Sequence, residues 1–502
     1  MPIDIDISPI SPERFRSVLA PDRFDAFERA THEARELLDG RVVWNVNSTA
    51  RGGGVVELLQ ALVAYARGAG VDARWVVIEG PPEFFAVTKR IHNRLHGVEG
   101  DGLPLDDGAR RTYEEVLADN VAELTPRVHE GDVVILHDPQ TAGMVEAMRG
   151  AGASVIWRCH IGLDTPNALA REAWAFLLPY LADANAYVFS RESFAWAGLD
   201  RDRIAVIPPT IDVFSPKNQD LDPATVEAVL RASGLVLGAG EPAPATFTRQ
   251  DGTPGRVERR ARLVEDERLR PDVPVVVQVS RWDLLKDPFG VIRGFAEHVP
   301  AGTGAHLVYA GPAVDAVADD PEGARVLRDS IALRDALPEA ARSRVHLATL
   351  PMDDAEENAI MVNALQRHAR AIVQKSLAEG FGLTVAEAMW KARPVVASRI
   401  GGIQDQIAHG DSGVLLDDPH DLAAYGGAVT ALLGDHGQAE RIGERARERV
   451  RDHFISTRSL LDYLALVRGL LTTPKRFAGA GRSTAPARTR PRQTPPLRSG
   501  SR

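Results

Sequence analysis

Short apolar runs alternate with longer amphipathic stretches along most of this chain, and they fall into two blocks. Runs of this length that are rich in Val, Ile and other large apolar residues predict buried strands, and the stretches between them predict helices. The first block has its strand-like runs at 41–48, 73–80, 132–138, 154–160, 186–190 and 204–209. The second block has them at 274–283, 305–311, 344–350, 370–376 and 394–399. Strands that alternate with helices are typical of parallel sheets, so the sequence predicts an α/β protein with two Rossmann-like domains.

The length of 502 residues agrees with two large domains, because one hydrophobic core rarely grows to this size. We expect an N-terminal domain at 1–237 and a C-terminal domain at 271–455. Between them, 238–270 is rich in Pro and Gly and then densely charged, which favours a surface insertion or linker. The tail 473–502 has eight basic residues and no acidic residue, with much Pro, Gly, Ser and Thr, so we expect it to be disordered. A solvated extension is a better interpretation of this tail than an arm that binds RNA or a partner.

Composition and targeting signals narrow the class of protein. The hydrophobic fraction of 44% is ordinary for a globular protein. A single cysteine, Cys159, excludes an internal disulfide framework and fits a reducing cytoplasm. Neither a leader sequence nor an apolar run of about 18 residues is visible, so we expect a cytoplasmic protein that does not span a membrane.

The most informative motif is EGFGLTVAE, which follows the strand-like run 370–376 and opens a predicted helix. Glycines in the turn allow close approach of a ligand, and the first turn of a helix offers unpaired N–H groups to an anion. The carboxylates of Glu379 and Glu387 at the two ends of the motif are strong acceptors for sugar hydroxyls. N–H groups that donate hydrogen bonds to phosphate, beside carboxylates that accept them from sugar hydroxyls, predict a site for a sugar nucleotide. The other residues assigned to donor binding in this motif are Gly380, Phe381, Gly382, Leu383 and Thr384.

Two cations follow the first strand of the second block. Arg281 lies near the end of the run 274–283, and Lys286 lies five residues after Arg281. A planar guanidinium and a point-charge ammonium can together neutralise a diphosphate. The acidic runs HDPQ and DDPEG lack a second ligand at a usable spacing, so we expect neither a metal ion nor another cofactor.

The first block has its own candidates at the ends of its strands, where open parallel sheets bind ligands. Gly52, Gly53 and Gly54 lie between a strand and a helix, which favours a close approach to phosphate or sugar over a flexible turn. Asp138 and His160 each end a strand-like run. Without further information, a histidine in such a place is more often structural than catalytic.

The Glu-x7-Glu motif resembles that of retaining GT-B glycosyltransferases of glycosyltransferase family 4. Further runs, among them VNSTARGGGVVELL, HDPQTAG, VSRWDLLKDPFGVI and GGIQDQI, resemble the trehalose glycosyltransferring synthases over about residues 41–416. The resemblance implies two domains that face one another across a cleft, with a final helix at 456–472 that crosses back to the N-terminal domain. It also implies a homodimer.

The resemblance further implies the reaction and the roles of the candidates. A retaining transfer would move glucose from ADP- or UDP-glucose to free glucose, reversibly, and give α,α-trehalose without an enzymic nucleophile. Glu379 would hold hydroxyls of the transferred sugar, Glu387 the ribose, Arg281 and Lys286 the diphosphate, and His160 the primary hydroxyl or a neighbouring backbone group. The acceptor would lie at Asp138, Gln140 and Asp164, and the base at Asn363, Leu365 and Gln366. No nucleic acid or membrane partner is expected.

One run departs from the resembled pattern. Where a His-Ile-Asp-Leu-Ser type run is expected, this chain has HIGLDTPN, so the acid is Asp164 and residue 162 is glycine. Two alternatives stay open: a trehalose phosphorylase that uses glucose 1-phosphate, and a non-catalytic regulator that binds sugar nucleotides on the same scaffold. Intact Arg281, Lys286, Glu379 and Glu387 argue against the regulator.

Overall fold

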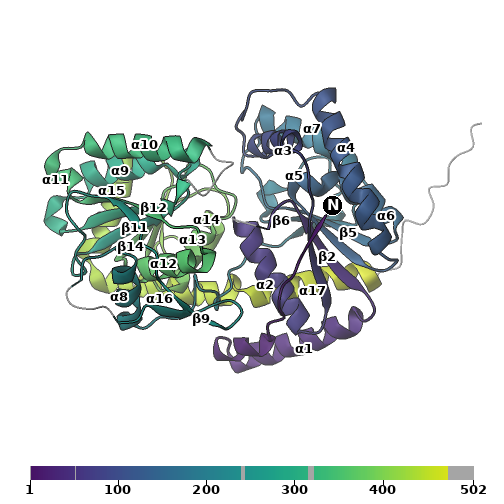
Figure 1. Ribbon diagram of the computed structural model, residues 1–502, viewed down its shortest axis with the longest axis horizontal. Coiled ribbons are helices and arrows are strands. Elements are labelled where there is room, and N and C mark those ends of the chain that lie inside the picture. Colours follow the sequence, from purple (N-terminus) through teal and green to yellow (C-terminus); the bar gives the residue numbers. More distant parts are fainter. Residues whose placement is uncertain (1, 51–52, 239–242, 315–320, 473–502) are drawn as a thin grey trace, which may run out of the picture.

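The N-terminal domain is built on a seven-stranded sheet of order β1-β3-β2-β4-β5-β6-β7. The computed structural model describes residues 2–50, 53–238, 243–314 and 321–472 (Figure 1). The strands of this sheet are β1 (Ile3–Ile5), β2 (Val42–Asn47), β3 (Asp72–Val77), β4 (Val133–His137), β5 (Ser154–Cys159), β6 (Ala186–Phe189) and β7 (Ile204–Val206). All neighbours are parallel except β1, which the sequence pattern did not predict and which pairs antiparallel with β3.

Both faces of this sheet are covered by helices, because its strands are apolar on both sides. Alternate residues of β2 point to opposite faces: Trp44 packs in the core that contains Phe84 and Tyr113, and Val43 in the core that contains Leu59. The helices of the N-terminal part are α1 (Pro21–Leu37), α2 (Gly54–Gly68), α3 (Pro82–Leu95), α4 (Asp107–Leu124), α5 (Asp138–Thr141), α6 (Val145–Gly150) and α7 (Ala168–Leu181).

A second seven-stranded sheet, of order β10-β13-β12-β11-β14-β15-β16, forms the C-terminal domain. Its strands are β10 (Arg262–Val264), β11 (Val275–Val279), β12 (His306–Pro312), β13 (Val345–Leu350), β14 (Ala371–Gln374), β15 (Val395–Ser398) and β16 (Val414–Leu416). Its helices are α8 (Pro223–Ala232), α9 (Pro288–His298), α10 (Pro321–Asp335), α11 (Glu339–Arg342), α12 (Ala355–His368), α13 (Leu383–Trp390), α14 (Ile403–Gln406), α15 (Leu422–Gly434) and α16 (His436–His453). The prediction of two parallel-sheet α/β domains is confirmed.

The chain crosses between the domains twice, at neighbouring places. The N–H of Ile211 donates to the carbonyl of Phe454, and the N–H of Ser456 donates to the carbonyl of Ile211. The second crossing leads into α17 (Ser456–Thr472), which packs against α1 and α2 of the N-terminal domain (Figure 1). Tyr463 and Val467 of α17 are buried in the core beneath this side of the N-terminal sheet.

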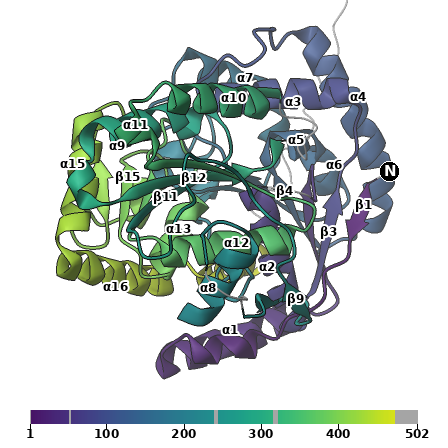
Figure 2. The same ribbon diagram turned by 60° about the vertical axis from the view of Figure 1, so that its left-hand side comes forward.

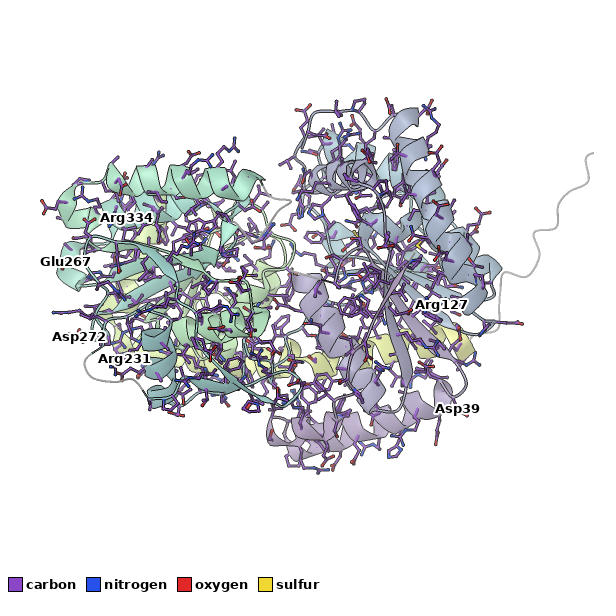
Figure 3. All side chains as sticks on the ribbon, viewed as in Figure 1. Asp39, Arg127, Arg231, Glu267, Asp272 and Arg334 are labelled. Atoms are coloured by element: carbon purple, nitrogen blue, oxygen red, sulfur yellow. The ribbon has the colours of Figure 1, made fainter. Side chains whose placement is uncertain are left out.

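The segment 238–270, for which the composition predicted a surface insertion or linker, has secondary structure in its described part. Its described part forms the hairpin of β8 (Thr246–Thr248) and β9 (Pro254–Arg256), and then β10, which pairs antiparallel with β13 at the edge of the C-terminal sheet. Arg334, labelled in Figure 3, donates to Asp266 at 2.7 Å and to the carbonyl of Val345, also at 2.7 Å, which fixes the segment to the sheet. Helix α8, which precedes the segment, packs on α12 (Figure 2). The C-terminal domain therefore begins before residue 238, because α8 and β10 both pack on it, although most of the charged side chains of the segment face water.

Candidate active site

The glycine turn of the EGFGLTVAE motif lies between β14 and α13. Gly382 caps α13 with φ +82°, a backbone conformation that other residues rarely adopt. The side-chain amide of Gln406 donates to the carbonyls of Phe381 at 2.6 Å and Gly382 at 3.2 Å, and it is fully buried. The Thr384 hydroxyl donates to Gln374 at the end of β14. These contacts hold the turn rigid and leave the first N–H groups of α13 for an anion.

A second glycine pair, which sequence reasoning did not assign to the site, supports this turn. The N–H of Gly402 donates to the carbonyl of Gly380 at 3.0 Å. A Cβ atom on Gly401 would lie 1.8 Å from the carbonyl oxygen of Glu379, so no larger residue fits there. The available signal was the GG pair directly after the run that became β15.

Lys286 and Glu379 lie together at the C-terminal ends of the strands. The Lys286 ammonium donates to Oε2 of Glu379 at 2.6 Å, and both side chains are largely buried. The Arg281 side chain is 60% exposed and donates to Asp283 at 2.8 Å. Both cations thus belong to one end of the sheet, with Arg281 free to turn toward a ligand.

One oxygen of the Glu387 carboxyl forms an ion pair, and the other has no hydrogen-bond partner among the described residues. Its side chain is 2% exposed, and Oε1 lies 3.6 Å from the Lys217 ammonium. Among the described residues, Oε2 has no hydrogen-bond partner. Burial raises the pKa of this carboxyl, and Lys217 opposes that shift. A buried acceptor without a partner costs free energy, so a bound hydroxyl would stabilise this site.

The glycine loop of the N-terminal domain lies against the motif of the C-terminal domain. Gly53, with φ +83°, caps α2, and a Cβ on Gly54 would lie 2.7 Å from a methyl group of Leu383. The N-termini of α2 and α13 therefore lie close together, as two anion-binding ends on either side of one site. Gly52 lies outside the described residues.

His160 is the end of a buried polar chain. Arg158 can only donate, and its Nε lies 3.4 Å from His160 Nδ1, so His160 carries its proton on Nε2. That N–H donates to His137 Nδ1 at 3.1 Å, and His137 Nε2 donates to Asn45 Oδ1 at 3.3 Å. Burial lowers the pKa of both histidines, so both rings are neutral. The carbonyl oxygen of His160 would lie 3.1 Å from a Cβ on Gly380, which places His160 beside the donor motif.

Asp138 shares this environment. It has φ +63°, and its Oδ1 accepts the backbone N–H of His160 at 2.7 Å. Burial raises the pKa of the Asp138 carboxyl to about 7. Gln140, two residues on, has a buried Oε1 atom without a partner in the part of the chain that the structure describes. Both side chains can offer acceptors to a sugar.

Asp164, predicted to bind the acceptor, connects the two domains. Its Oδ1 accepts from Arg191 and, at 3.1 Å, from Ser193. Its Oδ2 accepts from the N–H of Gly401 at 2.8 Å and from Gln404 at 3.1 Å. Both oxygens have partners in this arrangement, so a sugar hydroxyl bound by Asp164 would share these oxygens or displace a partner.

The departure at HIGLDTPN also has a structural reason. A Cβ on Gly162 would lie 2.1 Å from the ring of Phe194, so residue 162 has no room for a carboxylate.

The three residues proposed for the base lie in the interior, which corrects that prediction. Asn363, Leu365 and Gln366 are fully buried. The Asn363 amide donates to the carbonyls of Pro216 and Gln219, both at 2.9 Å, and so holds the segment that joins the domains. Leu365 belongs to the hydrophobic core, and both polar side-chain atoms of Gln366 are without a hydrogen-bond partner in the described part of the chain.

Sequence reasoning missed the end of α3. His92 and His96 lie with ring centroids 5.0 Å apart. Burial lowers the pKa of His96 to about 4, and Lys286 and Glu379 are among the charges that act on it. Burial also lowers the pKa of His92, with smaller contributions from His96, Lys89 and Arg281. Two neutral imidazoles thus face the cations of the C-terminal domain. Their i, i+4 spacing was the available signal.

Metal-binding clusters and membrane-spanning helices are both absent from the part of the chain that the structure describes. Within residues 2–50, 53–238, 243–314 and 321–472, no group of three or more His, Cys, Asp or Glu could hold a metal ion. In the same ranges no helix has the length and apolar character needed to cross a membrane.

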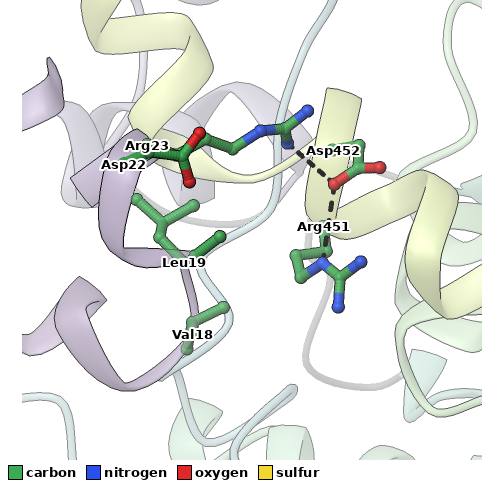
Figure 4. Close-up of a pocket in the computed structure, with 7 residues that line it drawn as sticks. Val18, Leu19, Asp22, Arg23, Arg451 and Asp452 are labelled. Carbon is green, nitrogen blue, oxygen red and sulfur yellow. Dashed lines mark hydrogen bonds and ion pairs between the residues drawn. The ribbon is translucent and has the colours of Figure 1, made fainter. Parts of the chain in front are cut away.

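A surface pocket of about 520 Å³ lies between the start of α1 and the end of α16 (Figure 4). None of the candidate site residues lines it. Arg23 and Arg451 lie 2.7 and 3.5 Å from the same oxygen of Asp452, so these charges join α1 to α16. The pocket therefore lies at the contact between two helices and is not the candidate active site.

Comparison with known proteins points to one family. Residues 45–196 match the model described as Trehalose synthase, N-terminal domain, and residues 354–449 match Glycosyl transferases group 1. The chain is 35% identical over 459 residues to a trehalose synthase of Rubrobacter xylanophilus. These aligned residues cover 91% of this chain and 96% of that protein.

More distant similarities agree with this result. A trehalose phosphorylase of Pleurotus pulmonarius is 26% identical over 468 residues, with 88% of this chain and 58% of that protein covered. Among solved structures, an E. coli protein described as trehalose-6-phosphate bound with UDP-2-fluoro glucose gives a TM-score of 0.62 at 14% identity, over 87% of this chain and 100% of that one. This last likeness concerns the fold alone.

Proposed function

The chain belongs to the trehalose synthase family of glycosyltransferases with the GT-B fold, and from this premise we propose that it transfers glucose from a nucleoside diphosphate glucose to free glucose. The product is α,α-trehalose, formed with retention at the anomeric carbon, and the reaction is reversible. ADP-glucose and UDP-glucose are the two candidate donors.

One observation carries the choice of a nucleotide donor. Glu387 keeps a buried oxygen without a partner, beside the glycine turn. A carboxylate at this place accepts hydroxyl donors and repels phosphate, and the ribose of a nucleotide offers two hydroxyls. Glucose 1-phosphate has no ribose, so the phosphorylase alternative leaves this acceptor without a use.

The residues divide the chemistry between them. As the bond from the anomeric carbon to phosphate breaks, negative charge grows on the leaving diphosphate. Lys286, Arg281 and the first N–H groups of α13 stabilise that charge, and one such fixed donor typically contributes about 3–4 kcal/mol. Because these groups supply positive charge directly, we propose that the reaction needs no metal ion. Glu379 accepts hydroxyls of the transferred glucose once the donor has displaced Lys286 from it.

Retention follows from attack on the face that the diphosphate leaves. The acceptor hydroxyl gives its proton to the departing phosphate oxygen, so no side chain needs to act as nucleophile or base. Both ring nitrogens of the neutral His160 are engaged by Arg158 and His137, so His160 does not take the proton of the sugar and would act on it only through its backbone.

A product analysis tests the proposal. Glucose is incubated with ADP-glucose or UDP-glucose, with and without inorganic phosphate, and the sugars are separated. Trehalose and free nucleoside diphosphate in equal amounts, without need of phosphate, support the synthase. Turnover of trehalose that requires inorganic phosphate supports the phosphorylase, and nucleotide binding without turnover supports a regulator.

A further inference from the structure

Lys217 lies between two carboxylates that come from different domains. Its ammonium contacts Glu57 of α2 and lies 3.6 Å from Oε1 of Glu387 of α13. The Lys217 side chain is 21% exposed, and it belongs to the segment that joins the domains. Burial alone lowers the pKa of this ammonium, but Glu387 and Glu57 carry it above its ordinary value. Lys217 therefore remains charged.

Glu387 needs this cation. Burial and the charge of Glu57 favour its protonated form. The other lysine nearby, Lys391, is a weak partner, because its ammonium donates to Asn218 and to the backbone carbonyl of Glu387, both at 3.0 Å. Burial lowers the pKa of Lys391 well below its ordinary value. Lys217 is thus the charge that opposes protonation of Glu387.

We infer that Lys217 is a positioning residue for the donor nucleotide: it fixes Oε1 of Glu387, keeps the carboxylate ionised, and leaves Oε2 for the ribose hydroxyls. The inference rests on the proposed function, in which Glu387 accepts from the ribose. Lys217 does not need to contact the nucleotide, because it acts through Glu387.

The same arrangement connects donor binding to the approach of the two domains. Glu57 is on the first turn of α2, whose first residue, Gly54, lies against Leu383 of α13. Lys217 has both carboxylates within reach only while these two helix ends are together. Bringing the two helix ends together therefore places a second carboxylate beside Lys217, and Glu57 then competes with Glu387 for this cation.

The charges around this site are few and come from each packed element. Glu57 is on α2, Lys217 is in the joining segment, and Lys391 follows the last residue of α13, the helix that carries Glu387. Arg367 of α12 and Asp220 act on Lys391. The terminal phosphate of the nucleotide also titrates at about pH 6, so the effect of these groups is measured as the ratio of ribonucleotide to dideoxynucleotide affinity.

The experiment measures binding of four probes by calorimetry: ADP, UDP and their 2′,3′-dideoxy forms. The wild type should bind the better ribonucleotide about tenfold to a hundredfold more tightly than its dideoxy form, the range for a hydrogen bond to a charged group. In Lys217→Met this preference should fall to less than threefold at pH 7, while the dideoxy form binds as before. Lys217→Arg keeps the charge and should keep most of the preference.

The double variant gives a second test. In a Glu387→Gln background, Lys217→Met should change ribonucleotide affinity by less than twofold, because its effect passes through Glu387. Glu57→Gln, which removes the competing carboxylate, should move the acid limb of ribonucleotide binding to lower pH, and Lys217→Met should move it to higher pH.

The outcomes separate the two proposals. A wild type that binds none of the nucleotides overturns the proposed function itself. A wild type that prefers ribonucleotides, together with a folded Lys217→Met that prefers them equally, overturns only the role of Lys217. If Lys217→Met does not fold, then the Lys217→Arg and Glu57→Gln results decide, and an unchanged acid limb in Glu57→Gln overturns the inference.

Discussion

Lys286 and Glu379 bind each other, with the ammonium 2.6 Å from Oε2 of the carboxylate. The group assigned to the diphosphate and the group assigned to the glucose thus neutralise one another within one partly buried pair. A donor that binds here exchanges this ion pair for phosphate on one side and hydroxyls on the other. The two ends of the donor are therefore recognised in one step.

Replacing Glu379 by Gln should lower kcat at least a hundredfold and leave the fold intact. The change keeps the volume but removes the charged acceptor for sugar hydroxyls and the partner of Lys286. Steady-state kinetics and a melting curve check both parts. Glu297→Gln, on the surface of α9 with 58% exposure, is the matched control and should change neither. Wild-type turnover in Glu379→Gln would contradict the assignment.

Arg281→Ala and Lys286→Ala should each cost roughly a hundredfold in kcat, because both cations act where charge grows in the transition state. The double variant should lose less than the product of the two factors, since both residues share one anion. Arg281→Lys should rescue only in part. The measurement is kcat and KM for donor and acceptor, with Arg270→Ala as control, because that arginine is 64% exposed. A rise in the glucose KM alone would place the residue at the acceptor.

Turnover should survive treatment with EDTA. Lys286, Arg281 and the N-terminus of α13 supply the positive charge that a metal ion supplies in other transferases. The rate of trehalose formation is measured before and after chelation, and again after addition of magnesium or manganese. Loss of activity that either metal restores would show that the diphosphate site is misassigned.

Asp138→Asn should stabilise the protein more at pH 8 than at pH 5. The carboxyl has its pKa raised from 3.8 to about 7, so the folded state holds a proton that the unfolded state loses in between. Stability is therefore lost as the pH rises through this window, and the amide removes that loss. We expect the gain to grow by about 1–2 kcal/mol from pH 5 to pH 8, a value reduced because the side chain is only half-buried.

Calorimetric melting at the two pH values checks this prediction. Asparagine also tolerates the positive φ of residue 138, and its Oδ1 can keep the hydrogen bond from the N–H of His160. His137 and His160 are neutral in the folded state of both proteins, so their contribution to the pH dependence cancels in the difference. An equal shift of Tm at both pH values would show that Asp138 is ionised throughout.

The pattern of apolar and polar residues predicted most of the strands of the two large sheets. Every apolar run assigned to a sheet contains a strand, because burial on both faces leaves a continuous apolar signal. It missed β1, β8, β9, β10 and β16, each only three residues long and at a sheet edge. Such strands are too short to show a period.

The sequence indicated which residues belong to the candidate site, but it did not indicate which of them contact one another. The sequence indicated Lys286, Glu379 and Glu387, but neither the pairing of the first two nor the role of Lys217 is visible in it, since these contacts join residues far apart in the chain. Asp164 and Asn363 show the same limit, because both use polar groups to join the two domains. The homodimer, the cytoplasmic location and the base preference stay predictions.

The return of α17 to the N-terminal domain sets the order of events during synthesis. Tyr463 and Val467 fill a core whose other members, such as Leu62 and Ile135, leave the ribosome more than half a chain earlier. At about 5–20 residues per second, that core waits on the order of tens of seconds for its last helix. Until then the nascent N-terminal domain exposes an apolar face, so chaperones that bind such faces would meet this protein before its release and not after it.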